Sequence, residues 1–196
     1  LAAYKAGSWV DKFVMIFSVA GFSIPVFVLG YILVYIFAME LRWLPVQGYR
    51  SPFDDGFLLF LKHITMPAVT LSVIYIALIS RMTRASVVEV LNEDYVRTAR
   101  AKGQSEFKIL LRHALPNAAV PIVTVLGISI ALMIGGVVVT ESVYNIPGLG
   151  RLVLDAVLSR DYGVIQGLIL FFSFIYIFIN LLIDLSYTLI DPRIRY

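Results

Sequence analysis

Four long apolar stretches alternate with polar connections along the chain. They cover approximately residues 13–39, 64–91, 116–140 and 163–190, and each is long enough to cross a hydrocarbon core about 30 Å thick as an α-helix. The first would reach about 40 Å as a straight helix, so we expect it to tilt or to bend at Pro25. The pattern predicts an all-α polytopic membrane protein with four transmembrane helices in this region.

Three polar connections separate these predicted spans, at residues 40–62, 92–115 and 141–162. We expect the second span to begin near Pro67, because proline suits the first turn of a helix. In the third connection, residues 151–159 carry apolar side chains at helical spacing, which predicts a short amphipathic helix.

The composition supports a membrane location, since 60% of the residues are hydrophobic and 15% are charged, against about 25% charged residues in soluble domains. We therefore treat residues 1–196 as a single transmembrane domain. The absence of cysteine excludes disulfides and thiolate metal sites. The chain begins at Leu1, inside a polar segment without a signal-peptide pattern, so we expect that N-terminal spans are missing.

Basic residues are distributed unevenly between the two sides of the predicted membrane. Residues 1–12, 81–113 and 191–196 hold eleven of the sixteen Lys and Arg, and the connections on the other side hold five. By the positive-inside rule, the 92–115 loop and both ends of the chain lie in the cytoplasm. The connections 40–62 and 141–162 are then external, and no nucleic-acid partner is indicated.

The cytoplasmic loop has the signals of two short helices joined at a glycine. Asn92 is suited to cap the first helix, and Glu93 and Asp94 fall in its first turn, where the helix dipole favours negative charge. Gly103 is suited to a left-handed C-terminal cap, and Ser105 to the start of the second helix. The loop is therefore predicted to be a rigid element that transmits motion to the flanking spans.

One face of the first loop helix is predicted to meet a cytoplasmic partner. Ala99 and Ala101 are small enough to let a partner backbone approach, and Arg97, Arg100 and Lys102 supply charges that fix its position. The alternative is an ordinary basic loop that only sets topology.

The spacing of this loop resembles the EAA loop of ABC importer permeases, in which E-A-A is followed by three residues, a glycine, nine residues and I-x-L-P. Four positions match that pattern, namely Ala99, Gly103, Leu115 and Pro116. The sequence departs from it at Arg97 and Thr98, which replace the first two letters, and at His113, which replaces the isoleucine.

The sequence DYVRTARAKG followed by LLRHALPNA is more similar to the B-type subunits of the dipeptide, oligopeptide and nickel branch of these permeases. Three other stretches resemble the same branch: ESVYNIPGLGRL from Glu141, SRDYGVIQG from Ser159, and NLLIDLSYTLIDPRIRY from Asn180. The resemblance extends over nearly all of the chain in consistent order. It implies a type I ABC importer permease fold, with six spans in the full subunit and two of them before this region.

The resemblance implies the permease subunit of an ATP-driven, binding-protein-dependent importer of di- or oligopeptides. Nickel chelates, glutathione and other small solutes are alternative substrates. The implied partners are a second permease subunit, two cytoplasmic ATP-binding subunits and an external substrate-binding protein, in the cytoplasmic membrane of a bacterium or archaeon. The resemblance assigns coupling to the ATPase to Glu93, Asp94, Tyr95, Arg97, Thr98, Ala99, Arg100, Ala101, Lys102 and Gly103.

Independently of the family, the chain lacks a G-x-x-x-x-G-K-[ST] phosphate loop. ATP and Mg²⁺ are therefore expected in partner subunits, with no cofactor in this chain.

Two further groups of residues are candidates for function in transport. A docking surface or gate on the external side is predicted at Glu141, Asn145, Pro147, Gly148 and Arg151, with a plain solvated loop as an equal alternative. A lining of the passage is predicted at Gly127, Ser129, Gly135 and Gly136, where small residues would also suit close helix packing.

No constellation for catalysis or metal binding is evident, so we expect that the chain is not an enzyme. His63 and His113 lie far apart without carboxylates at ligand spacing, and Asp54 and Asp55 are adjacent rather than set across a cleft. Asp184 lies in an apolar helix near its inner end, where a functional and a structural role are equally plausible. A non-transporting membrane scaffold or sensor is the alternative from another functional class.

Overall fold

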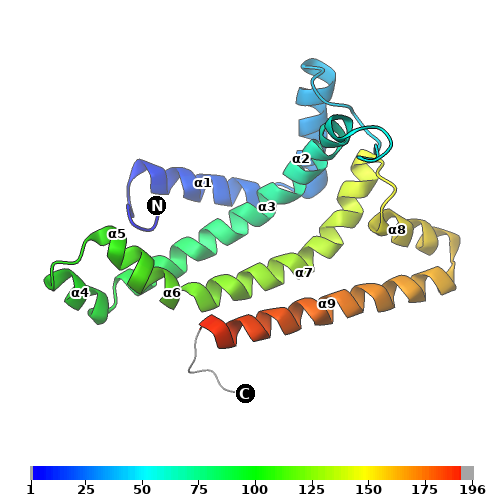
Figure 1. The fold of residues 1–196 in the computed structure, drawn as a ribbon. Coiled ribbons are helices and arrows are strands. Elements are labelled where there is room, and N and C mark those ends of the chain that lie inside the picture. Colours follow the sequence, from blue (N-terminus) through cyan, green and yellow to red (C-terminus); the bar gives the residue numbers. More distant parts are fainter. Residues whose placement is uncertain (1, 191–196) are drawn as a thin grey trace. The chain divides into compact units, whose positions relative to one another are not determined.

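The computed structural model describes residues 2–190, and every regular element in that range is a helix (Figure 1). The all-α prediction is thereby confirmed. The elements in chain order are α1 (Trp9–Ser23), α2 (Val26–Leu33), the π-helix η1 (Val34–Glu40), α3 (Phe57–Leu91), α4 (Asp94–Ala101), α5 (Glu106–Ile109), the π-helix η2 (Leu110–Ala114), α6 (Leu115–Asn117), α7 (Ala119–Tyr144), α8 (Leu149–Ser159) and α9 (Tyr162–Ile190).

Three of these helices, α3, α7 and α9, are long and apolar enough to cross a membrane. The fourth predicted span is a broken helix, because α1 ends at Ser23 and α2 follows Pro25. Proline has no backbone N–H and disfavours the helical conformation in the residue before it, which explains the break at the predicted place. The chain has up to four candidate spans when the broken pair is taken as one.

Two predicted helix boundaries are wrong at the ends of α3 and α7. Helix α3 begins at Phe57, so residues 57–62 belong to it and Pro67 lies inside it, not in its first turn. The preceding residues FLLFLKHITM include several good helix formers, and one missing N–H does not end a helix that continues on both sides.

Helix α7 begins at Ala119, three residues after Pro116, and runs four residues beyond the predicted end at 140. Its last carbonyls have partners in the connection before α3: the Gly48 N–H donates to the Tyr144 oxygen over 2.8 Å, and the Gln47 side-chain amide donates to the Val143 oxygen. Because these carbonyls are satisfied, the helix continues to Tyr144.

Contacts within the chain divide it into two compact units, where we expected a single domain. The first contains the described residues 2–21, 76–129 and 178–190, and the second contains residues 22–75 and 130–177. The core of the first unit is formed by Val87, Leu91, Val96, Ala99, Ile109, Ala114 and Ala118. The core of the second unit is formed by Val34, Ala38, Met66, Val143 and Tyr144.

The core of the second unit contains a buried hydrogen-bond cluster around Tyr144. The Tyr144 hydroxyl lies 2.8 Å from the Thr70 hydroxyl and donates to the Gly30 carbonyl oxygen. The Thr70 hydroxyl also donates to the Met66 carbonyl oxygen. Since buried hydroxyls are costly without partners, these bonds hold the end of α7 against α2 and α3.

Candidate functional site

Helix α4 has one face buried in the core of the first unit and one face exposed. Val96 is 0% exposed and Ala99 is 7% exposed. Tyr95, Arg97, Thr98, Arg100, Ala101 and Lys102 are exposed. Ala99 therefore packs in the chain's own core. The prediction that it lets a partner backbone approach is wrong. The face that remains open to a partner is polar and carries Lys102 without an ion pair among the described residues.

The predicted glycine corner is present after α4. Gly103 has a φ of +75°, its N–H donates to the Arg100 oxygen over 2.9 Å, and the Gln104 N–H donates to the Ala99 oxygen over 3.3 Å. These two bonds and the left-handed residue form a Schellman cap, which satisfies the last carbonyls of the helix. The position of the C-terminal cap is thus confirmed.

At the other end of α4, the N-cap residue is Glu93, not the predicted Asn92, and its side chain makes no capping bond. Ser105 occupies the N-cap position of α5 as predicted, although its hydroxyl also makes no capping bond. Both N-cap residues have extended backbone conformations. The start of each helix therefore depends on its backbone conformation and packing, without side-chain capping.

Two side-chain links brace the glycine corner. The Arg100 guanidinium donates two hydrogen bonds to the Glu106 carboxylate, over 2.8 and 3.3 Å. A hydrogen bond of 3.0 Å also joins the Gln104 side-chain oxygen to His113 Nε2. A bidentate arginine–carboxylate pair fixes orientation as well as distance, so α4 and α5 are held at a defined angle. This role of Glu106, Gln104 and His113 was not predicted from the sequence, because their spacing matches no helical repeat.

The exposed side of α4 carries weaker interactions. Arg97 and Asp94 form an ion pair of 3.2 Å between two highly exposed side chains, which contributes little to stability. Partial burial and the nearby Glu93 carboxylate raise the pKa of Tyr95 above its ordinary value. The Tyr95 hydroxyl is protonated at neutral pH, as in any ordinary tyrosine, and is available as a donor on this face.

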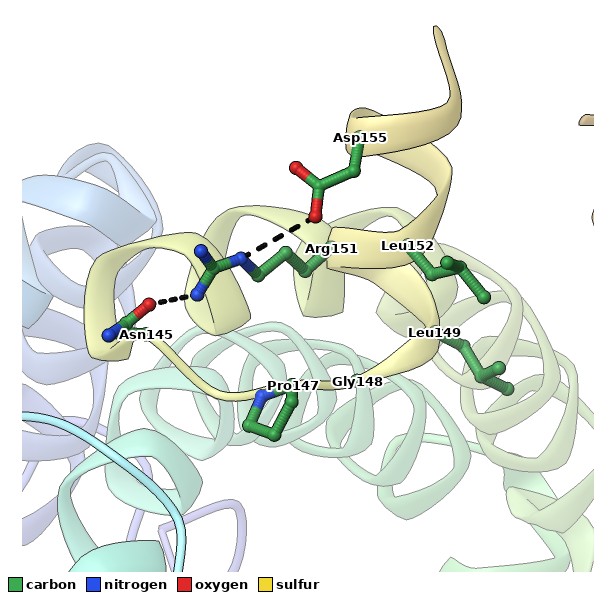
Figure 2. A pocket seen from close by; sticks show the side chains of 7 residues that line it. All are labelled: Asn145, Pro147, Gly148, Leu149, Arg151, Leu152 and Asp155. Carbon is green, nitrogen blue, oxygen red and sulfur yellow. Dashed lines mark hydrogen bonds and ion pairs between the residues drawn. The ribbon is translucent and has the colours of Figure 1, made fainter. Parts of the chain in front are cut away.

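A second candidate site lies on the connection between α7 and α9, in the second unit. A pocket of about 670 Å³ is lined by Asn145, Pro147, Gly148, Leu149, Arg151, Leu152 and Asp155. Figure 2 shows the Arg151 side chain between Asn145, to which it donates a hydrogen bond, and Asp155, with which it forms an ion pair of 3.8 Å. Leu149 and Leu152 provide an apolar side to the same pocket.

Four of the five residues predicted for an external docking surface or gate line this pocket: Asn145, Pro147, Gly148 and Arg151. Glu141 does not line it, and its carboxylate instead accepts a hydrogen bond from the Arg151 backbone N–H. Asp155 was not predicted as a member of this site, although its position four residues after Arg151 is the spacing of a helical ion pair.

The four residues predicted to line a passage have different surroundings. Gly127 and Ser129 are buried in the first unit, and the Ser129 hydroxyl donates to the Val125 oxygen of its own helix. A Cβ atom at Gly136 would lie 3.2 Å from Leu71 and from the Tyr75 hydroxyl. Gly135 is exposed, and a Cβ atom there would meet nothing within 4 Å. Gly127 therefore serves close helix packing, whereas Gly135 has open space beside it.

We expect Gly127→Leu to lower thermal stability and Gly135→Leu to leave it unchanged. A side chain at Gly127 would overlap Ile183 of α9, and overpacking typically costs about 1–3 kcal/mol. The measurement is the apparent melting temperature of the purified protein in detergent. Ile183→Ala should restore part of the loss in Gly127→Leu, and equal melting temperatures for the two leucine variants would contradict the packing role.

Within residues 2–188, whose side chains are described, no group of three His, Asp or Glu residues lies close enough to hold a metal ion. His63 is hydrogen-bonded to the Leu59 carbonyl oxygen of its own helix. Asp54 and Asp184 are both exposed, and Asp55 forms an ion pair with Arg50 over 3.5 Å.

The whole chain, residues 1–196, matches the family model described as binding-protein-dependent transport system inner membrane component. The chain belongs to this family. Three similar relatives support the assignment to a transport permease. A probable peptide ABC transporter permease protein of Sinorhizobium fredii is 59% identical over 196 residues, and a glutathione transport system permease protein of Escherichia coli is 46% identical over the same length. A putative peptide transport system permease protein of Brucella abortus is 45% identical.

Each comparison covers 100% of this chain but only 61% or 62% of the relative's own length. This inner membrane component thus spans about three fifths of the curated relatives that it matches. The resemblance to the peptide branch of ABC importer permeases is confirmed.

One contact of this inner membrane component was not predicted from its sequence. The Asp11 carboxylate is 4% exposed and accepts two hydrogen bonds from the Arg84 guanidinium and one from the Gly7 N–H. A buried carboxylate needs such partners. The pair therefore fixes the start of α1 to α3 within the first unit.

Proposed function

We propose that this chain is the permease subunit of an ATP-driven, binding-protein-dependent importer of di- or oligopeptides. The observation that carries the proposal is the 59% identity, over the entire chain, to a probable peptide ABC transporter permease. The relative described as a glutathione permease fits the same chemistry, because glutathione is itself a tripeptide. The family description names a binding-protein-dependent transport system and an inner membrane component, which supports both the external binding protein and the membrane location in this proposal.

In this proposal the partners are a second permease subunit, two cytoplasmic ATP-binding subunits that use ATP and Mg²⁺, and an external substrate-binding protein. The open face of α4 contacts an ATP-binding subunit, with Arg97, Arg100, Ala101 and Lys102 on the surface. On the external side, the binding protein docks at the pocket beside α8. The 92–115 loop and both ends of the chain are cytoplasmic, as the distribution of basic residues predicts.

The braced corner supports a role for α4 in transmitting motion. Its core face packs on Val87 and Leu91 at the end of α3, so a displacement of α4 also displaces that helix. Closure of the ATP-binding pair would then move the loop and reorient the spans joined to it. A loop that only sets topology would not need a buried core or a bidentate brace.

Reconstitution of the full-length subunit with its partners into liposomes tests the proposal. We expect ATP-dependent uptake of a labelled dipeptide only when the binding protein is supplied on the external side. Glutathione and a nickel chelate, assayed in parallel, distinguish the alternative substrates. Copurification of ATP-binding subunits without uptake of any of these solutes would instead support a membrane scaffold or sensor.

A further inference from the structure

Glu141, near the end of α7, holds the N-terminus of α8. The Arg151 N–H donates a hydrogen bond of 2.8 Å to one oxygen of the Glu141 carboxylate. Arg151 is the third residue of α8, so this N–H is among those that have no acceptor within the helix. A carboxylate at this position also interacts favourably with the dipole of the helix.

Two glycines bring the backbone of α8 against α7 at the same place. A Cβ atom at Gly150 would lie 2.7 Å from the Val138 Cα and 2.8 Å from the Val138 nitrogen, so the two backbones are in direct contact. A Cβ atom at Gly148 would overlap the Glu141 carboxylate. The carboxylate thus occupies space that exists only because residues 148 and 150 lack side chains.

The surroundings of Glu141 show that its charge is directed to α8 and not to an external surface. No Lys or Arg side chain forms an ion pair with it among the described residues. It lies outside the pocket of Figure 2 and lines a different cavity of about 360 Å³, together with Pro67, Leu71 and Thr140. Glu141 therefore lines that cavity and also contacts the N-terminus of α8.

We infer that Glu141 is a positioning residue that makes α8 follow α7, so that a protein docked on α8 acts on a helix that crosses the membrane. The inference rests on the proposed function, which supplies the external binding protein. In this role Glu141 does not contact the binding protein itself. The docking surface is formed by the pocket residues, and Glu141 fixes the direction in which that surface faces.

The mobility of α8 tests the physical part of the inference. Residues 1–196 contain no cysteine, so Leu158→Cys, in a subunit whose remaining part is also made cysteine-free, creates a unique labelling site on an α8 side chain that is 74% exposed. The label is a nitroxide, read by electron paramagnetic resonance in the complete transporter assembled with cysteine-free partner subunits. We expect Glu141→Ala and Gly150→Ala to increase the mobility of the label, because the first removes the hydrogen bond to the Arg151 N–H and the second forces the α8 backbone away from Val138.

The ratio of ATP hydrolysis with and without the binding protein tests the functional part. A hydrogen bond to a charged group typically changes such a conformational equilibrium by about tenfold or more. We therefore expect Glu141→Ala to reduce the stimulation by the binding protein by about tenfold. Glu141→Gln retains an oxygen acceptor for the Arg151 N–H and should retain most of the stimulation. Ser142→Ala is the matched control, because that exposed hydroxyl bonds to the Val138 oxygen of its own helix and not to α8.

The inference is overturned if Glu141→Ala leaves both the label mobility and the stimulation as in the unmodified protein. It is also overturned if Glu141→Gln loses stimulation as fully as Glu141→Ala while the label stays immobile, since the charge would then act directly on the binding protein. Failure of the unmodified transporter to hydrolyse ATP with its partners refutes the proposed function instead. In that case, the label mobility still decides whether Glu141 holds α8.

Discussion

Replacing Gly103 by valine should abolish ATP-driven uptake, whereas replacing it by asparagine should preserve much of it. Gly103 has a φ of +75°, a conformation that asparagine adopts several-fold more often than other residues with side chains and that β-branched residues avoid. A Cβ atom there would meet nothing within 4 Å. The difference between the two variants therefore reports backbone conformation alone, without steric contact, and strain of this kind costs about 1–3 kcal/mol.

The expected loss follows from what the corner holds in place. The Schellman cap, the Arg100–Glu106 pair and the Gln104–His113 bond all depend on the left-handed residue between α4 and α5. With valine the corner opens, and α4 no longer presents its surface at a fixed angle to the ATP-binding subunit.

The assay compares ATP-dependent uptake per inserted transporter for the valine, asparagine and unmodified proteins. The inserted amount is measured separately, so that poor insertion is not mistaken for uncoupling. Uptake by the valine variant at the unmodified rate would show that the corner's conformation is not required for transport.

Local sequence signals were sufficient to predict the elements whose conformation depends on a few neighbouring residues. The corner at Gly103 and the break at Pro25 follow from the backbone preferences of glycine and proline, and both are confirmed. The long apolar runs were enough to identify α9 almost to the residue. These features require no information about what the segment packs against.

The predicted start of α3 is wrong because it relied only on the preference of proline for the first turn of a helix. Proline is favoured in the first turn, but Pro67 is preceded by ten residues that continue the helix to Phe57. The end of α7 was misplaced for another reason. Its last carbonyls are satisfied by Gln47 and Gly48, nearly a hundred residues earlier in the chain, and such a partner leaves no local signal.

The role of Glu141 could not be predicted from the sequence, for a similar reason. The sequence places Glu141 and Arg151 in one connection, but only the fold shows that the backbone N–H of Arg151, not its guanidinium, contacts the carboxylate. Likewise, Gly127 and Gly135 are equivalent in the sequence, and their different surroundings depend on Ile183 in α9.

Ala99→Glu and Ala101→Glu place the same side chain two residues apart in α4, and we expect only the first to impair folding. Ala99 is 7% exposed and lies in the core with Val96, Ile109 and Leu91, whereas Ala101 is exposed. An unpaired carboxylate in the core costs on the order of 3 kcal/mol or more. Ala99→Glu should therefore disrupt the packing of the loop and greatly reduce the amount of protein that survives in the membrane.

Ala101→Glu should insert at the unmodified level, because its carboxylate remains in solvent. It places a negative charge between Arg100 and Lys102 on the surface proposed to meet the ATP-binding subunit, so we expect weaker copurification of that subunit. Immunoblots of membrane fractions, with limited proteolysis of the loop, measure the first effect, and pull-down measures the second. Two variants with equal membrane levels and equally impaired copurification would mean that Ala99 faces the partner after all, and the assignment of the two faces of α4 would have to be reversed.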